Sequence, residues 1–382
     1  MRVTAEMIEA AAGGVLAIDL DALRWNYAQL CRAAAPATCG GVVKADAYGL
    51  GAARLAPVLY AGGCRDFFVA HAGEGAALRP HLGGDAAVFV LNGLQPGAEP
   101  LAAELGLIPV LNSLEQAERW AIEAGRRAGR LPAALQVDSG MSRLGMMPGE
   151  VEAFVAREDL RRFIDLRLVM SHLACADEPD HPANRAQRAA FAGLAEHFPG
   201  VRLSLANSGG ILLDPGFRHD LARPGVALYG VTPTPDRDIG LRPVIALHAK
   251  VIQVRTIPAG AAVGYGATFV APAPMRIATL AVGYADGWPR HLSGTGAAFH
   301  GSTRLPILGR VSMDSMTVDV TALPEGTLGL GSLVELVGPH QTLDTMAAEA
   351  GTIAYEILTR LGDRYARTYV GTGMDSAGEG SA

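Results

Sequence analysis

Lys44 is the residue whose type and surroundings point most directly to chemistry. It follows the apolar residues 40–43 and precedes Ala45. A lysine at the end of a buried strand is costly unless it is paired, uncharged or covalently bonded. Burial lowers the pKa of a lysine, and the neutral amine can form a Schiff base with a carbonyl group. The alternative is a lysine that reaches solvent, and Lys44 taken alone favours that alternative.

Two glycine-containing segments offer a site for a phosphate group. Residues 207–210 read Asn-Ser-Gly-Gly, and residues 223–226 read Arg-Pro-Gly-Val. Small residues let backbone N–H groups approach an anion closely, and parallel barrels often hold phosphate after their seventh and eighth strands. A carbonyl-reactive lysine together with a phosphate cradle predicts pyridoxal phosphate, which carries both an aldehyde and a phosphate.

The elements that would position these residues form a repeating pattern between residues 15 and 245. Eight short apolar runs alternate with stretches of helical periodicity, as expected for parallel strands that are buried on both faces. This predicts a (β/α)8 barrel over 15–245, with an open doubly wound sheet as the alternative. Polar residues near the ends of the runs would gather at one rim: Lys44, His71, Asn92, Asn112, Asp138, Arg143, His172, Asn207, Ser208 and Arg223.

The pattern of predicted secondary structure changes after residue 245. Residues 246–372 contain β-type runs separated by turn residues and predict an all-β domain, with a single helix within residues 342–365. The fold class is therefore α/β plus all-β, an N-terminal TIM-like barrel followed by a C-terminal β-domain. The segment 1–14 is a candidate addition to the β-domain, and the low-complexity tail 373–382 is predicted to be mobile.

Composition narrows the classes of function. Of 382 residues, 49% are hydrophobic and 18% charged, which excludes a disordered chain. The net charge of −6 argues against a nucleic-acid surface. No apolar run reaches the roughly 18 residues of a membrane helix, the acidic N-terminus does not resemble a signal peptide, and the four cysteines form no C-x-x-C pair. We expect a cytoplasmic protein that binds neither nucleic acid nor membrane and holds no metal.

Ten segments in both predicted domains resemble alanine racemase, a family of fold-type-III pyridoxal phosphate enzymes. The most specific of them are VVKADAYGLG, LQVDSGMSRLG and GRVSMDSMTVD. The ten segments lie at residues 17–26, 42–51, 135–145, 171–178, 206–210, 223–230, 263–269, 281–290, 309–319 and 352–357.

The resemblance implies a catalytic set. Lys44 would bind the cofactor covalently and act as the base on one face of the substrate α-carbon, and Tyr265 would act on the other face. His172 would link Tyr265 toward Arg223, and Arg223 would face the pyridine nitrogen. A guanidinium stays protonated, so the ring nitrogen would stay unprotonated. The cofactor would then be a weak electron sink, which limits side reactions such as transamination.

The resemblance also implies binding residues and a homodimer. The cofactor contacts would be Tyr48, one helical turn after Lys44, with Asn207, Ser208, Gly225, Val226 and Tyr355. The residues around an amino-acid substrate would be Arg143, Tyr284, Met313 and Asp314. Tyr265, Tyr284, Met313 and Asp314 would come from the partner subunit and complete its active site.

The sequence departs from the family pattern at three positions. Gln136 stands where many relatives carry a carbamylated lysine, so we predict no carbamyl-lysine here. Ser204 stands where relatives often have a histidine that supports the arginine, which puts the orientation of Arg223 in doubt, and Ser312 replaces a frequent cysteine. A racemase of broader specificity, a non-catalytic cofactor carrier and a decarboxylase remain alternatives. The sequence also leaves open a biosynthetic or catabolic role.

Overall fold

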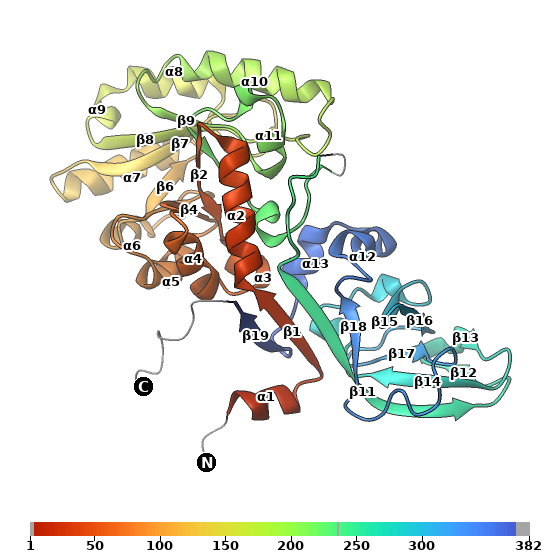
Figure 1. Cartoon of the computed structure of the whole chain (residues 1–382). Coiled ribbons are helices and arrows are strands. Elements are labelled where there is room, and N and C mark those ends of the chain that lie inside the picture. The colour runs from red at the N-terminus through yellow and green to blue at the C-terminus, as the bar shows by residue number, and fades with distance from the viewer. Residues whose placement is uncertain (1–3, 235–236, 372–382) are drawn as a thin grey trace. The chain divides into compact units, whose positions relative to one another are not determined.

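The chain forms two compact units, each described here by itself. A computed structural model describes residues 4–234 and 237–371 (Figure 1). One unit comprises residues 22–242, which we call the barrel unit. The other combines the N-terminal residues up to Asp21 with the chain from Pro243 onward, and we call it the β-unit. Among the described residues, no helix has both the length and the apolar character needed to cross a membrane.

The barrel unit contains the eight predicted strands. Seven pair in sequence order and in parallel: β3 (Gly41–Val42), β4 (Asp66–Val69), β5 (Ala87–Val90), β6 (Ile108–Leu111), β7 (Leu131–Gln136), β8 (Ile164–Met170) and β9 (Arg202–Ser204). The eighth, β10 (Leu221–Ala222), pairs in parallel with the short β2 (Thr38–Cys39). Backbone hydrogen bonds from Asp220 to Leu203 and from Val42 to Pro224 continue the ring past β10. The barrel prediction is confirmed.

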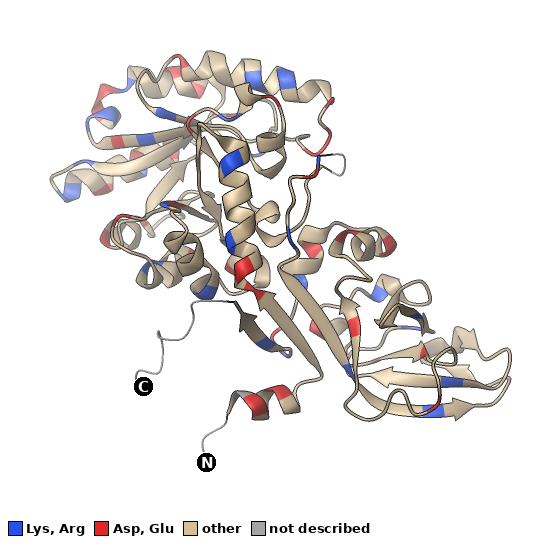
Figure 2. Cartoon of the chain, in the orientation of Figure 1, with Lys and Arg blue, Asp and Glu red and all other residues tan. Residues whose placement is uncertain are grey.

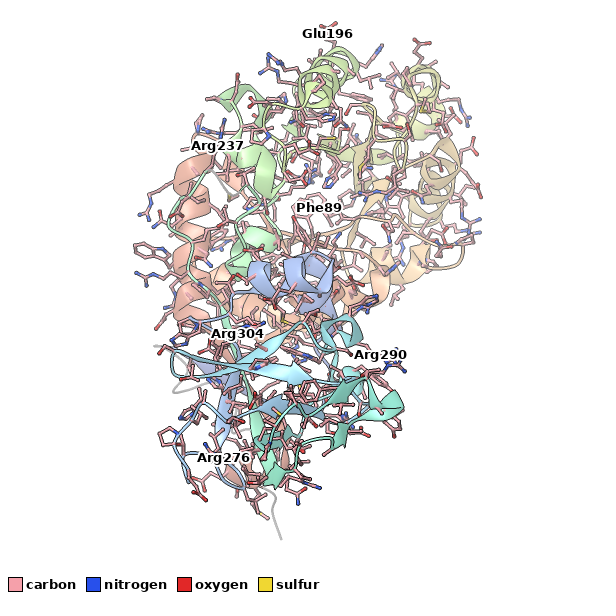
Figure 3. All side chains as sticks on the ribbon, turned by 90° about the vertical axis from the view of Figure 1, so that its right-hand side faces the viewer. Phe89, Glu196, Arg237, Arg276, Arg290 and Arg304 are labelled. Carbon is pink, nitrogen blue, oxygen red and sulfur yellow. The ribbon has the colours of Figure 1, made fainter. Side chains whose placement is uncertain are left out.

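The strands are buried because helices cover their outer faces and large side chains fill the interior. Phe89 on β5, labelled in Figure 3, is 1% exposed and stacks on Phe68 with ring centroids 4.8 Å apart. In α7 (Leu114–Arg126) the buried Ala117, Trp120 and Ala124 recur at helical spacing, and Ser113 caps the helix by accepting from the Gln116 N–H. On the outside of the unit, α7 and α9 (Glu158–Arg161) carry charged residues of both signs, whereas α8 (Pro148–Ala156) carries only acidic and α10 (Pro182–Ala195) only basic ones (Figure 2).

The helices of the barrel unit follow the strands in the predicted alternation. They are α2 (Leu20–Ala34), α3 (Lys44–Gly49), α4 (Ala52–Ala61), α5 (Ala72–Leu78), α6 (Glu99–Glu104), α7 (Leu114–Arg126), α8 (Pro148–Ala156), α9 (Glu158–Arg161), α10 (Pro182–Ala195) and α11 (Ser208–Leu212). Short 3₁₀ turns are η1 (Arg79–His81), η2 (Pro215–Phe217) and η3 (Val226–Tyr229). Each helix brings the chain back to the start of the next strand, so the strand ends share one rim.

The β-unit is built on one eight-stranded sheet that closes on itself. Its order is β14 (Met275–Leu280), β17 (Met316–Asp319), β16 (Thr303–Leu308), β15 (Ala297–His300), β18 (Leu333–Val337), β11 (Ile245–Ile257), β1 (Gly14–Asp19) and β19 (Ala366–Val370). The long strand β11 also pairs with β14, which closes an antiparallel barrel. The hairpin β12 (Ala262–Val263) and β13 (Phe269–Val270), the helices α1 (Ala5–Ala11), α12 (Leu343–Ala350) and α13 (Ala354–Arg360), and the turns η4 (Tyr265–Ala267), η5 (Tyr284–Asp286) and η6 (Arg290–Leu292) complete it.

Two features of the β-unit differ from the sequence expectations. The predicted barrel begins at residue 15 and so includes residues 15–19, but these belong to β1, which pairs antiparallel with β11 and parallel with β19. The single helix expected near the C-terminus is two helices, because Gly351 ends α12 in the left-handed region with φ of 68°. The tail 373–382 lies outside the described residues.

Candidate active site

Lys44 stands at the end of β3 on a left-handed turn. The four residues after it, Ala45 to Tyr48, have φ between 51° and 57°. This conformation costs roughly 1–2 kcal/mol for each non-glycine residue, so surrounding contacts must hold it. Tyr48 thus follows Lys44 by one turn, as expected, but the turn is left-handed, which the sequence does not predict.

Glu74 ties this turn to the segment that follows β4. One carboxylate oxygen accepts the Ala45 N–H at 2.9 Å, and the other accepts the Ala70 N–H at 2.6 Å. Asp46 closes the far side by accepting the Ala52 N–H at 2.7 Å. Glu74 was missed by sequence reasoning, although its place three residues after His71 completes a capping box at the start of α5.

Four basic side chains come together at the rim of the barrel unit. The pKa of the half-buried Lys44 is lowered, first by burial and then by the charge of Arg143, while Glu74 opposes the shift. Burial, followed by the charges of Arg223, Arg143 and Lys44, lowers the pKa of His172 to about 3. The His172 imidazole is therefore neutral at pH 7. This set of residues attracts anions, and its lysine is shifted toward the nucleophilic neutral form.

Arg223 is held rigidly inside the barrel. Its side chain is 4% exposed and donates to the Ser204 hydroxyl and, at 2.6 Å, to the Ser171 carbonyl oxygen. The Ser204 hydroxyl donates to the Leu221 carbonyl at 2.5 Å, so its oxygen is free to accept from the guanidinium. Burial lowers the pKa of Arg223 to about 9, and the group is protonated at pH 7. Ser204 thus supports the arginine directly, and the placement of Arg223 against the pyridine nitrogen stays a prediction.

The Ser208 hydroxyl of α11 and the backbone N–H groups of Gly225 and Ala227 lie together where a phosphate is predicted, and we call this group the anion cradle. The Ser208 hydroxyl accepts the N–H groups of Gly225 at 2.9 Å and Ala227 at 3.3 Å. A Cβ atom added at Gly225 would lie 2.3 Å from the Tyr48 hydroxyl oxygen, so glycine is required for this close approach. The donor set of hydroxyls and backbone N–H groups fits a phosphate group.

Two other residues predicted at the cofactor site have structural roles. The Asn207 side chain caps α11 by accepting the Gly210 N–H at 2.9 Å. Val226 is buried and begins η3, directly after Gly225. Direct contacts of these two residues with a cofactor stay predictions.

Arg143 projects from a closed loop between β7 and α8. Asp138 folds the loop by accepting the N–H groups of Gly140 and Ser142. The loop ends are joined by hydrogen bonds between the Asp138 N–H and the Met146 carbonyl, and between the Met146 N–H and the Gln136 carbonyl. The Gln136 side chain donates to the Leu144 carbonyl at 3.0 Å. Gln136 therefore supports Arg143 through the loop backbone and supplies no negative charge.

The remaining predicted residues all belong to the β-unit, where they are exposed. Tyr265 is 73% exposed and lies between Gly264 and Gly266, which have φ of 74° and 73°. Tyr284 and Met313 lie on neighbouring loops, because the Tyr284 N–H donates to the Ser312 carbonyl at 3.0 Å. Tyr355 and Asp314 are also exposed. Sequence reasoning did not find the buried Asp286 beneath Tyr284, or Arg364, which binds it.

Fold and site together define a class of enzyme. A parallel barrel that holds a desolvated lysine, a buried arginine and an anion cradle at one rim is built for covalent chemistry on a phosphate-bearing carbonyl compound. Residues 18–233 match the family model of the alanine racemase N-terminal domain, and residues 244–369 match that of the C-terminal domain. The chain belongs to the alanine racemase family of enzymes.

Individual relatives agree with this assignment over nearly the whole chain. The alanine racemase of Brucella canis is 56% identical over 373 residues, which is 94% of each chain. The catabolic alanine racemase of Agrobacterium fabrum is 52% identical, over 99% of this chain and 97% of that one. The structure of alanine racemase from Bartonella henselae with covalently bound pyridoxal phosphate superposes with a TM-score of 0.90 at 42% identity, over 94% of this chain and 100% of that one.

Proposed function

We propose that this enzyme interconverts L- and D-alanine by a two-base mechanism in which each active site uses residues of two subunits. The observation that carries the proposal is the desolvated Lys44, whose pKa is lowered beside Arg143, at a rim that also holds the anion cradle. The cofactor is pyridoxal phosphate. Lys44 would hold its aldehyde carbon, Ser208, Gly225 and Tyr48 its phosphate, and Arg223 its ring nitrogen.

When bound, pyridoxal phosphate draws electrons from the substrate α-carbon and makes the proton there removable. Lys44 would remove or return this proton on one face, and Tyr265 of the partner subunit would do so on the opposite face. A phenol has an ordinary pKa near 10 and needs a neighbour to take up its proton. The imidazole of His172 is neutral at pH 7, so one of its ring nitrogens can accept a hydrogen bond. Arg223 stays protonated and would donate a hydrogen bond to the ring nitrogen, which would then stay unprotonated.

The homodimer is part of the proposal. Tyr265, Tyr284 and Met313 are large side chains of the β-unit that are 73%, 41% and 52% exposed. Large apolar and aromatic side chains exposed together are typical of surfaces that bind another protein. A second copy of the chain would receive these residues at its barrel rim, next to Lys44.

Subunit complementation tests the shared site. The variants Lys44→Ala and Tyr265→Phe should each lose most racemase activity as homodimers. After the two variants are mixed, dissociated and allowed to reassociate, half of the dimers contain both chains, and one of their two sites has both bases intact. Activity should therefore recover to about a quarter of the wild-type value. If the mixture stays inactive although mass spectrometry detects mixed dimers, the shared site is wrong.

The proposal covers both a biosynthetic and a catabolic role. Relatives are described both as biosynthetic, in Pseudomonas aeruginosa, and as catabolic, in Agrobacterium fabrum, and we propose alanine as the substrate in either role. Rates with alanine and serine would distinguish an alanine racemase from one of broader specificity. All four cysteines are free thiols, which supports the prediction of a reducing, cytoplasmic location.

A further inference from the structure

Arg364 joins two carboxylates from separate loops of the β-unit. Its guanidinium donates to both oxygens of Asp286, at 2.7 and 2.9 Å, and to Asp314 at 2.6 Å. Asp286 is 4% exposed, whereas the Asp314 side chain is 63% exposed. A bidentate pair with a buried carboxylate has a fixed geometry, so the third N–H group of Arg364 holds Asp314 in a defined position.

The two carboxylates belong to loops that also touch through their backbones. Asp286 accepts the Gly283 N–H at 2.9 Å, which fixes the turn that carries Tyr284. The Ala285 N–H donates to the Met313 carbonyl at 2.9 Å, from the turn that carries Asp314. A Cβ atom at Gly283 would lie 2.4 Å from the Met313 carbonyl oxygen, so the two turns are in close contact.

We propose that Arg364 is a positioning residue that sets the substrate affinity and the size selectivity of the racemase. It holds the turns of Tyr284 and Met313 together and offsets part of the negative charge of Asp286 and Asp314. The inference rests on the proposed function, in which these two turns face the substrate. The inference explains why the two turns have a fixed position: Arg364, which lies 50 positions after Asp314 in the chain, holds them.

The charge of Arg364 is part of the argument. An amino acid reaches the site with a negatively charged carboxylate, and Asp314 is an exposed negative charge on the turn that would meet it. With Arg364 in place, the guanidinium and the two carboxylates together carry a net charge of −1, and without it the charge is −2. Without Arg364, Asp314 repels the substrate, and the Tyr284 turn loses both guanidinium contacts to Asp286. Both effects weaken substrate binding, whereas Lys44 and the cofactor cradle in the barrel unit are untouched.

Steady-state kinetics of Arg364→Gln provide the test. The loss of charge-assisted hydrogen bonds should raise the KM for alanine about tenfold. The kcat should stay within about threefold, and the rate with serine relative to alanine should rise because the turns can move apart. The double variant Arg364→Gln with Asp314→Asn should recover part of the KM, since it removes the repelling carboxylate. The control is Arg360→Gln, because Arg360 is exposed and pairs with Glu356 on its own helix.

A second variant keeps the test valid if Arg364→Gln fails to fold. Asp286→Asn retains one acceptor oxygen and should shift KM and the serine-to-alanine ratio in the same direction. A further single variant is Arg364→Lys. Because Asp286 and Arg364 act as one unit, the double variant Asp286→Asn with Arg364→Lys should raise the KM by less than the two single effects combined. An unchanged KM for alanine and an unchanged serine-to-alanine ratio in both Arg364→Gln and Asp286→Asn would overturn the inference. The proposed function fails separately, if Lys44→Ala retains racemase activity.

Discussion

Lowering the pH from 8 to 5 should leave the imidazole of His172 uncharged. Burial and the charges of Arg223, Arg143 and Lys44 lower its pKa to about 3, from a usual value of about 6.5. At pH 5, two units above this pKa, only about one molecule in a hundred is protonated, whereas an unperturbed histidine would be almost fully protonated. The shift of about 3.5 units corresponds to roughly 5 kcal/mol that disfavours the charged form.

The lowered pKa of His172 also makes the free energy of unfolding depend on pH. Below pH 6.5 the unfolded chain takes up a proton on His172, but the folded protein does so only near pH 3. The unfolded state therefore binds more protons in this window, and the free energy of unfolding falls as the pH falls. Between pH 6.5 and pH 5 the loss due to His172 is about 2 kcal/mol. His172→Gln removes this contribution, so the variant should lose about 2 kcal/mol less than the wild type over that interval.

Two measurements check this prediction. NMR of the protein labelled with ¹³C in its histidine rings should show one resonance, absent from His172→Gln, that keeps the neutral chemical shift down to pH 5. Urea denaturation of both proteins at pH 6.5 and 5 should give the difference in stability loss. A resonance that titrates near pH 6.5, with parallel stability curves for the two proteins, would refute the argument that this imidazole is kept neutral by its surroundings.

Two further predictions concern the cradle and the thiols. Gly225→Ala should weaken cofactor binding at least about tenfold, or ~1.4 kcal/mol, because the added Cβ would lie 2.3 Å from the Tyr48 hydroxyl. Absorbance titration with pyridoxal phosphate measures this, Gly73→Ala in open space is the control, and equal affinities would contradict it. Cys31 has its pKa lowered to about 7, chiefly by a hydrogen bond from Cys39, so its alkylation by iodoacetamide should rise steeply between pH 6 and 8. The pKa of the buried Cys39 is raised, so peptide mapping should find it unlabelled, and equal labelling of both thiols would contradict the assignment.

The barrel was predictable because its signal is local. Strands that are buried on both faces are continuous apolar runs, and each run ends where the chain meets the rim. Lys44, His172 and Arg223 follow directly from this rule, since each stands at the end of such a run. The partners of β1 were not predictable, because a short strand does not reveal whether it pairs with its neighbour or with β11, more than 200 residues away. Likewise, nothing local to Arg364 indicates that it reaches Asp286.

The left-handed turn after Lys44 shows where local reasoning ends. Of Ala45 to Tyr48 only Asp46 belongs to a residue type that tolerates positive φ, and the glycine at positive φ, Gly49 at 82°, comes only after these four residues. The turn exists because tertiary contacts outweigh its strain, and the Glu74 carboxylate in the first turn of α5 supplies one of them by accepting the Ala45 N–H. The charge of Glu74 also opposes the lowering of the Lys44 pKa that burial and Arg143 cause. One carboxylate thus influences both where the lysine stands and how readily it loses its proton, so the geometry and the reactivity of Lys44 depend on the same contact.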